Sequence, residues 1–116
     1  MRRHFTLLLA AALAAVLALA ALATASTPTR SVKIGDYYFV HHKPGVVVHV
    51  KKNTRVVWRF QGQDTHNVTV SKGPVKFHSR DKDHGTYARK MTRKGTYRIY
   101  CSIHGSSVMR MTLVVK

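Results

Sequence analysis

The chain of 116 residues contains no glutamate and only four aspartates, against 20 lysine and arginine residues. Two of the basic residues, Arg2 and Arg3, fall in a predicted leader; without them 18 basic residues remain and the formal charge is +14. So large a positive charge favours acidic partners and speeds association with them. It also fits retention on an anionic cell surface, but it does not bear on the fold.

Cysteine is scarcer still, because Cys101 is the only one, and a disulfide bond within the chain is therefore excluded. Exported proteins normally use cysteines in pairs. A lone thiol is an inert buried residue, an intermolecular link or a metal ligand, and the cysteine count leaves these alternatives open. Ligation of a metal would also protect the thiol in an oxidising compartment.

The N-terminal 25 residues have the features of a secretory signal peptide. A basic head, residues 1–4, precedes an apolar run over residues 5–22, and Ala23-Thr24-Ala25 offers small residues at the positions that a signal peptidase recognises. We predict cleavage after Ala25 and export to the periplasm, the extracellular space or the cell surface. A retained membrane anchor is the alternative, because the apolar run is long enough to cross a bilayer.

A sustained helical period is missing after the leader, and the pattern is typical of β-structure throughout. Short runs rich in Val, Ile, Tyr, Thr and Phe are separated by turn residues such as Gly35-Asp36 and Gly73-Pro74. These runs cover residues 32–34, 37–40, 46–50, 55–60, 67–71, 86–91, 96–101 and 109–115. Many short strands at regular spacing predict an all-β fold, an antiparallel sandwich or barrel. We expect residues 26–31 to form a flexible lead and residues 32–116 one domain, with a short strand near residues 75–77 inside a surface loop.

Alternation along two of these runs predicts which side chains face the core. Tyr97, Ile99 and Cys101 share one face of their run, and the charged Arg98 marks the opposite face as the outer one. Cys101 should therefore point inward at the end of its strand. By the same rule, the core side chains of residues 55–60 are Val56, Trp58 and Phe60.

Three residues that can bind a metal lie within nine positions at the end of that strand: Cys101, His104 and Met109. A further histidine, His66, comes much earlier, at the start of another β run. One thiolate, two imidazoles and one thioether form the ligand set of a blue-copper electron-transfer centre. Taken singly, a buried cysteine is usually a small core residue, but the combination favours copper.

In these motifs the chain resembles the small cupredoxins of the plastocyanin, amicyanin and pseudoazurin type, over nearly all of the part after the leader. Cys101, His104 and Met109 match the Cys-x2-His-x4-Met loop of that family, and His66-Asn67-Val68 matches the segment of its first ligand. Gly95-Thr96-Tyr97-Arg98-Ile99-Tyr100-Cys101 matches the strand before the loop.

The resemblance implies a Greek-key β-sandwich of about seven to eight strands and one type 1 copper ion. The implied ligands are His66, Cys101, His104 and Met109. Asn67 and Ser102 would hydrogen-bond between the two ligand loops and near the sulfur.

The chain departs from the family pattern in two places. Met111 stands where the family often has glycine, so it either fills the core or competes as the axial ligand, and we assign it to the core. Gly105-Ser106-Ser107 is small and polar where the family usually has an apolar docking patch, so docking would rely more on charge.

The implied function is that of an exported one-electron carrier rather than an enzyme. Its partner would be an acidic redox protein, namely a cytochrome, an oxidase or a copper enzyme, and we expect a monomer. The alternative is a copper-binding protein that buffers or delivers the metal. A basic domain that binds polyanions is a third hypothesis. We expect no specific nucleic-acid binding, since the aromatic residues alternate along strands instead of interleaving with arginines in a stacking groove.

Overall fold

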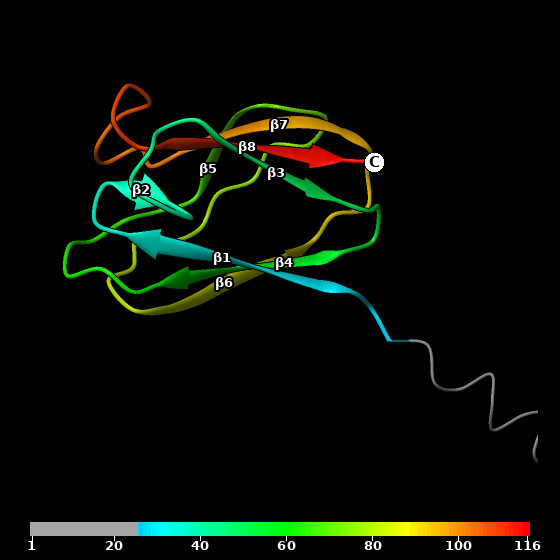
Figure 1. The fold of residues 1–116 in the computed structure, drawn as a ribbon, viewed down its shortest axis with the longest axis horizontal. Coiled ribbons are helices and arrows are strands. Elements are labelled where there is room, and N and C mark those ends of the chain that lie inside the picture. Colours follow the sequence, from blue (N-terminus) through cyan, green and yellow to red (C-terminus); the bar gives the residue numbers. More distant parts are fainter. Residues whose placement is uncertain (1–25) are drawn as a thin grey trace, which may run out of the picture.

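Eight strands are the regular elements of the computed structural model, which describes residues 26–116 (Figure 1). In chain order they are β1 (Thr29–Gly35), β2 (Tyr38–Phe39), β3 (Val46–Val50), β4 (Arg55–Phe60), β5 (Thr69–Lys72), β6 (Gly85–Lys90), β7 (Gly95–Tyr100) and β8 (Arg110–Val115). The predicted leader, residues 1–25, lies outside the described residues. Among residues 26–116, no helix has the length and apolar character needed to cross a bilayer.

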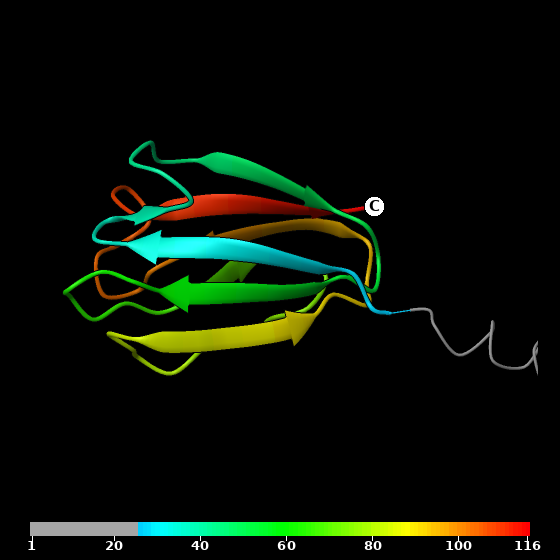
Figure 2. The same cartoon turned by 60° about the horizontal axis from the view of Figure 1, so that its bottom comes forward.

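The strands form two facing sheets, in the orders β2-β1-β4-β6 and β3-β8-β7-β5, which confirms the predicted all-β sandwich. Figure 2 shows β1, β4 and β6 side by side in the first of these sheets. Two strand pairs depart from the antiparallel arrangement that the strand spacing predicted, because β1 with β4 and β3 with β8 run parallel. The chain changes sheet between most successive strands, so several sheet neighbours, such as β1 with β4 and β3 with β8, are distant in sequence.

The first strand begins earlier than predicted, at Thr29 instead of Val32. Residues 29–31, which we assigned to a flexible lead, pair in parallel with residues 55–57 of β4. Their side chains are exposed, so no apolar pattern marks this part of the strand. Backbone pairing with β4 extends the ordered domain into the predicted lead.

The short strand expected near residues 75–77 does not form. This segment lies beside β5, with an isolated bridge between Thr69 and His78. Pro74 has no N–H to donate to a ladder, and the pairing of β5 with β7 is itself interrupted by a register shift. The segment is held by separate backbone hydrogen bonds, Val70 N–H to Phe77 O at 3.0 Å and Ser79 N–H to Val68 O at 2.8 Å, without a continuous ladder.

The core residues predicted by alternation are confirmed in both runs. Tyr97, Ile99 and Cys101 are at most 1% exposed, and Val56, Trp58 and Phe60 at most 4%. Complete burial of a large apolar side chain contributes roughly 1.5–3 kcal/mol. The inward position of Cys101 thus follows from the same packing that joins the two sheets.

Three connections meet at the end of the sandwich that lies opposite the C-terminus (Figure 1). They are the β1–β2 turn, the β4–β5 loop and the β7–β8 loop. Because β1 and β4 are parallel neighbours, the connections that follow them begin side by side. All the residues that we predicted as metal ligands lie at this end of the sandwich.

Candidate metal centre

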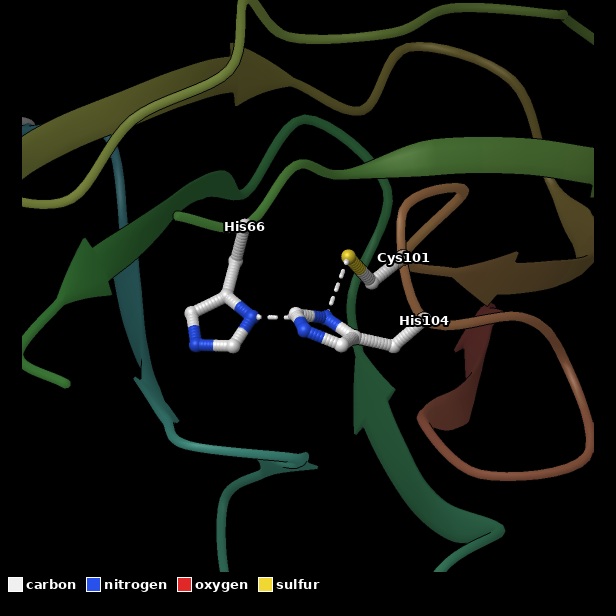
Figure 3. Close-up of side chains that lie close together, drawn as sticks. All are labelled: His66, Cys101 and His104. Carbon is white, nitrogen blue, oxygen red and sulfur yellow. Dashed lines mark hydrogen bonds between the residues drawn. The ribbon is translucent and has the colours of Figure 1, made fainter. Parts of the chain in front are cut away.

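His66, Cys101 and His104 come together from two loops that are far apart in the sequence (Figure 3). His104 Nδ1 lies 3.2 Å from His66 Nδ1 and 3.4 Å from Cys101 Sγ. The donor atoms of the three residues all lie within 4.8 Å of one another. No other group of this kind is found among His, Cys, Asp and Glu side chains of residues 26–116.

The β7–β8 loop is closed by its own backbone. Cys101 N–H donates to Met109 O at 3.1 Å, and Gly105 N–H donates to Cys101 O at 2.9 Å. Gly105 has φ of +86°, a left-handed conformation that glycine adopts without strain. The turn therefore keeps Cys101 and Met109 opposite each other at its base, with His104 between them in sequence.

Both methionines near the centre are buried, Met109 at 0% and Met111 at 1% exposure. Met111 lies on β8, pairs with Ile99, and belongs to the hydrophobic core. Met109 belongs to the same hydrophobic core, so the assignment of Met109 as the axial ligand in place of Met111 stays a prediction. Met109 immediately precedes β8, and its backbone contact with Cys101 places it at the base of the ligand loop.

Asn67 joins the two ligand loops. Its side-chain Nδ2 donates to Ser102 Oγ at 2.7 Å, and its Oδ1 accepts from the Ser102 backbone N–H at 2.9 Å. Asp81 and Thr69 hydrogen-bond to the same amide, each at 2.9 Å. Since Asn67 follows His66 and Ser102 follows Cys101, this amide fixes the spacing of the histidine and the thiol.

Asp36, which contacts His66 directly, was not among the predicted site residues. Asp36 Oδ1 lies 3.0 Å from His66 Nε2, the ring nitrogen opposite the one that faces His104. The backbone N–H groups of Gln63 and Asp64 donate to the Asp36 carboxylate. These two hydrogen bonds and the one with His66 lower the pKa of Asp36 from 3.8 to about 2. Sequence reasoning missed this residue because the turn after β1 is brought to His66 by the parallel pairing of β1 with β4, which the sequence pattern does not reveal.

Tyr37, the next residue in the same turn, packs against the other imidazole. Its ring meets the His104 ring edge-on, with centroids 4.8 Å apart. Its hydroxyl donates to Asp64 Oδ2 at 2.7 Å, which raises the pKa of Tyr37 above its ordinary value. The backbone of Tyr37 has φ of +68°, an uncommon conformation outside glycine. The β1–β2 turn thus contacts both histidines of the cluster.

The surface near His104 is more apolar than the sequence of the loop suggested. Tyr37, Ile103 and Val108 are each about half exposed, at 51%, 49% and 46%. His104 itself is partly exposed, whereas His66 and Cys101 are buried. His104 is therefore the member of the cluster that is most accessible from this end of the sandwich.

The donor set fits a copper ion of type 1. For metal–nitrogen bonds of about 2.0 Å, a metal–sulfur bond of about 2.3 Å and trigonal angles, donor atoms stand roughly 3.5–3.8 Å apart. The observed 3.2 and 3.4 Å contacts are close to that spacing, and all three donor atoms lie within 4.8 Å of one another. Two imidazoles and one thiolate in a plane are the strong ligands of such a site.

Comparison with known proteins agrees with this chemistry. The family described as "Copper binding proteins, plastocyanin/azurin family" matches residues 29–116. A solved structure of an amicyanin variant in the Cu(I) form is similar with a TM-score of 0.64 and 23% identity, over 81% of this chain and 88% of that chain. An oxidised amicyanin variant gives a TM-score of 0.59 and 25% identity, over 81% and 88%.

A Cu-containing nitrite reductase from Thermus scotoductus SA-01 is also similar, with a TM-score of 0.61 and 23% identity. The match covers 77% of this chain but only 22% of the reductase. No curated protein sequence matches significantly. At these identities the solved structures establish the fold, and the family match establishes the class.

Proposed function

Because the chain belongs to the plastocyanin/azurin family of copper-binding proteins, we propose that it carries single electrons between redox partners. The proposed copper ligands are His66, Cys101, His104 and Met109. Copper bound there would alternate between Cu(I) and Cu(II), since thiolate and thioether suit Cu(I) and imidazole suits both states.

The hydrogen bonds by which Asn67 joins the two ligand loops are the observation that most supports a role in electron transfer. An electron carrier works best when its ligands keep the same positions in both oxidation states. Asn67 ties the His66 loop to the Cys101 loop through two hydrogen bonds to Ser102. Hydrogen bonds of this kind orient metal ligands and are costly to lose.

The burial of the ligands favours an electron carrier over a protein that delivers copper. His66, Cys101 and Met109 are at most 1% exposed, so a chelating partner could not reach them without opening the loops. Only His104 of the four is partly exposed. We therefore propose that electrons leave the copper site through the His104 imidazole.

The partner that we propose is an acidic redox protein, a cytochrome, an oxidase or a copper enzyme. The formal charge of +14 after the leader would steer it toward the protein. Tyr37, Ile103 and Val108 supply apolar surface beside His104, so charge would govern the encounter and apolar contact the final docking. We further propose that the protein acts as a monomer after export and cleavage of the leader near Ala25.

The test is electron transfer from the reduced protein to an acidic cytochrome, followed by stopped-flow absorbance at increasing ionic strength. We expect rapid transfer whose bimolecular rate constant falls steeply with salt, because exposed charges are screened within about 10 Å at 0.1 M. A copper-delivery protein would instead lose Cu(I) quickly to a chelator and exchange electrons slowly. That combination of results would refute the proposal.

A further inference from the structure

The β1–β2 turn holds a carboxylate against the side of His66 that faces away from the metal centre. Asp36 Oδ1 lies 3.0 Å from His66 Nε2, while His66 Nδ1 lies 3.2 Å from His104 Nδ1. His66 is 1% exposed, so water cannot easily replace the carboxylate as the partner of Nε2. The two ring nitrogens therefore meet two different environments.

A neutral imidazole carries a proton on one nitrogen and a lone pair on the other. Asp36 is ionised and can only accept a hydrogen bond, so it selects the tautomer of His66 with the proton on Nε2. The lone pair is then on Nδ1, which points at the cluster with Cys101 and His104 (Figure 3). In the metal-free protein, His66 therefore already has the tautomer that metal binding through Nδ1 requires.

The carboxylate is itself held firmly in place. Gln63 N–H donates to both Asp36 oxygens and Asp64 N–H donates to Oδ1, each at 3.0 Å. A side chain at Gly62 would place its Cβ 2.2 Å from Asp36 Oδ1, so glycine is needed for this close approach. The turn thus fixes the carboxylate relative to the backbone that leads to His66.

We infer that Asp36 is a positioning residue of the copper site, which fixes the tautomer of His66 and stabilises Cu(II) relative to Cu(I). The inference rests on the proposed role of His66 as a ligand. The physical reason is that a carboxylate on the outer nitrogen makes the imidazole more basic. Its negative charge also favours the more highly charged oxidation state. Asp36 would therefore lower the reduction potential.

The experiment compares Asp36→Asn with Asp83→Asn in the purified copper protein. Both variants remove one negative charge, but the Asp83 side chain lies at the surface in contact with His84 and is not part of the ligand cluster. Three quantities are measured: Cu(II) and Cu(I) affinity by competition with chelators, the reduction potential by voltammetry, and the His66 tautomer from ¹⁵N chemical shifts in the metal-free protein. Zn²⁺ affinity gives a further readout that does not depend on redox activity.

For Asp36→Asn we expect Cu(II) and Zn²⁺ affinity to fall by about 10–100-fold, and Cu(I) affinity to fall less. A tenfold fall in the ratio of Cu(II) to Cu(I) affinity raises the potential by about 59 mV. The ¹⁵N shifts should show a mixture of His66 tautomers, whereas Asp83→Asn should resemble the parent in every respect.

Equal potentials and affinities in the two variants, with an unchanged His66 tautomer, would overturn the inference about Asp36. A parent protein that binds Cu(II) without any contribution from His66 would instead overturn the proposed ligand set. A His66→Ala variant separates these outcomes. It should lose more Cu(II) affinity than Asp36→Asn if His66 is a ligand.

Discussion

Replacement of Asn67 by alanine should loosen the metal centre by uncoupling its two loops. The change removes two hydrogen bonds to Ser102, one to Thr69 and one to the Asp81 carboxylate. A neutral hydrogen bond contributes roughly 0.5–1.5 kcal/mol and one to a charged group roughly 1.5–3 kcal/mol. Because Ser102 and Asp81 are exposed and can bind water instead, we expect a net loss of about 2–3 kcal/mol.

The assay is urea unfolding of the metal-free protein, followed by the fluorescence of Trp58, the only tryptophan. Ser102→Ala is the matched control, because it removes only the bond to Oγ and keeps the backbone bond to Asn67. It should cost about 1 kcal/mol. If Asn67→Ala destabilised the protein no more than Ser102→Ala, the role of Asn67 as the link between the loops would be refuted.

Three further predictions concern the same end of the sandwich. Met109→Leu should raise the reduction potential and shift the visible spectrum, whereas Met111→Leu, a change of similar volume in the core, should leave both unchanged; the opposite result would identify Met111 as the axial ligand. Gly62→Ala should displace the Asp36 carboxylate, which lies 2.2 Å from the new Cβ, and lower the Cu(II) affinity measured by titration; an unchanged affinity would argue against a tight turn. In the metal-free protein, the pKa of Asp36 is lowered from 3.8 to about 2. The ionised carboxylate therefore contributes fully to the free energy of unfolding when the pH is above 3.8, and this contribution is lost as the pH falls through about 2. Acid titration of Asp36→Asn should therefore show a shallower loss of stability than the parent, and parallel curves would contradict this.

Period-two alternation predicted most of the strands, and the inward faces of β4 and β7, because the buried side chains of a strand that packs in a sandwich repeat every second residue. It placed Cys101 inward, and the close spacing of Cys101, His104 and Met109 placed three candidate ligands in one loop. The meeting of His66 with that loop followed from the family resemblance. The local pattern by itself could not have shown it, because the residues are 38 positions apart.

The β1–β2 turn could not be predicted to reach the metal centre. Asp36 acts on His66 across 30 positions, and the contact depends on the parallel pairing of β1 with β4, which alternation does not reveal. Tyr37 adopts a positive φ, which its residue type disfavours. The strand segment at residues 29–31 was missed for a related reason, since its backbone is paired while its side chains are all exposed.

The visible spectrum of the protein after addition of one equivalent of Cu(II) tests the central claim most directly. A Cys101 thiolate bound to Cu(II) together with two histidines should give an intense sulfur-derived absorption that bleaches reversibly on mild reduction. Cys101→Ser should bind copper without that band. A parent protein that takes up Cu(II) and shows no such absorption, or a Cys101→Ser variant with the same spectrum as the parent, would contradict a type 1 copper site built on His66, Cys101 and His104.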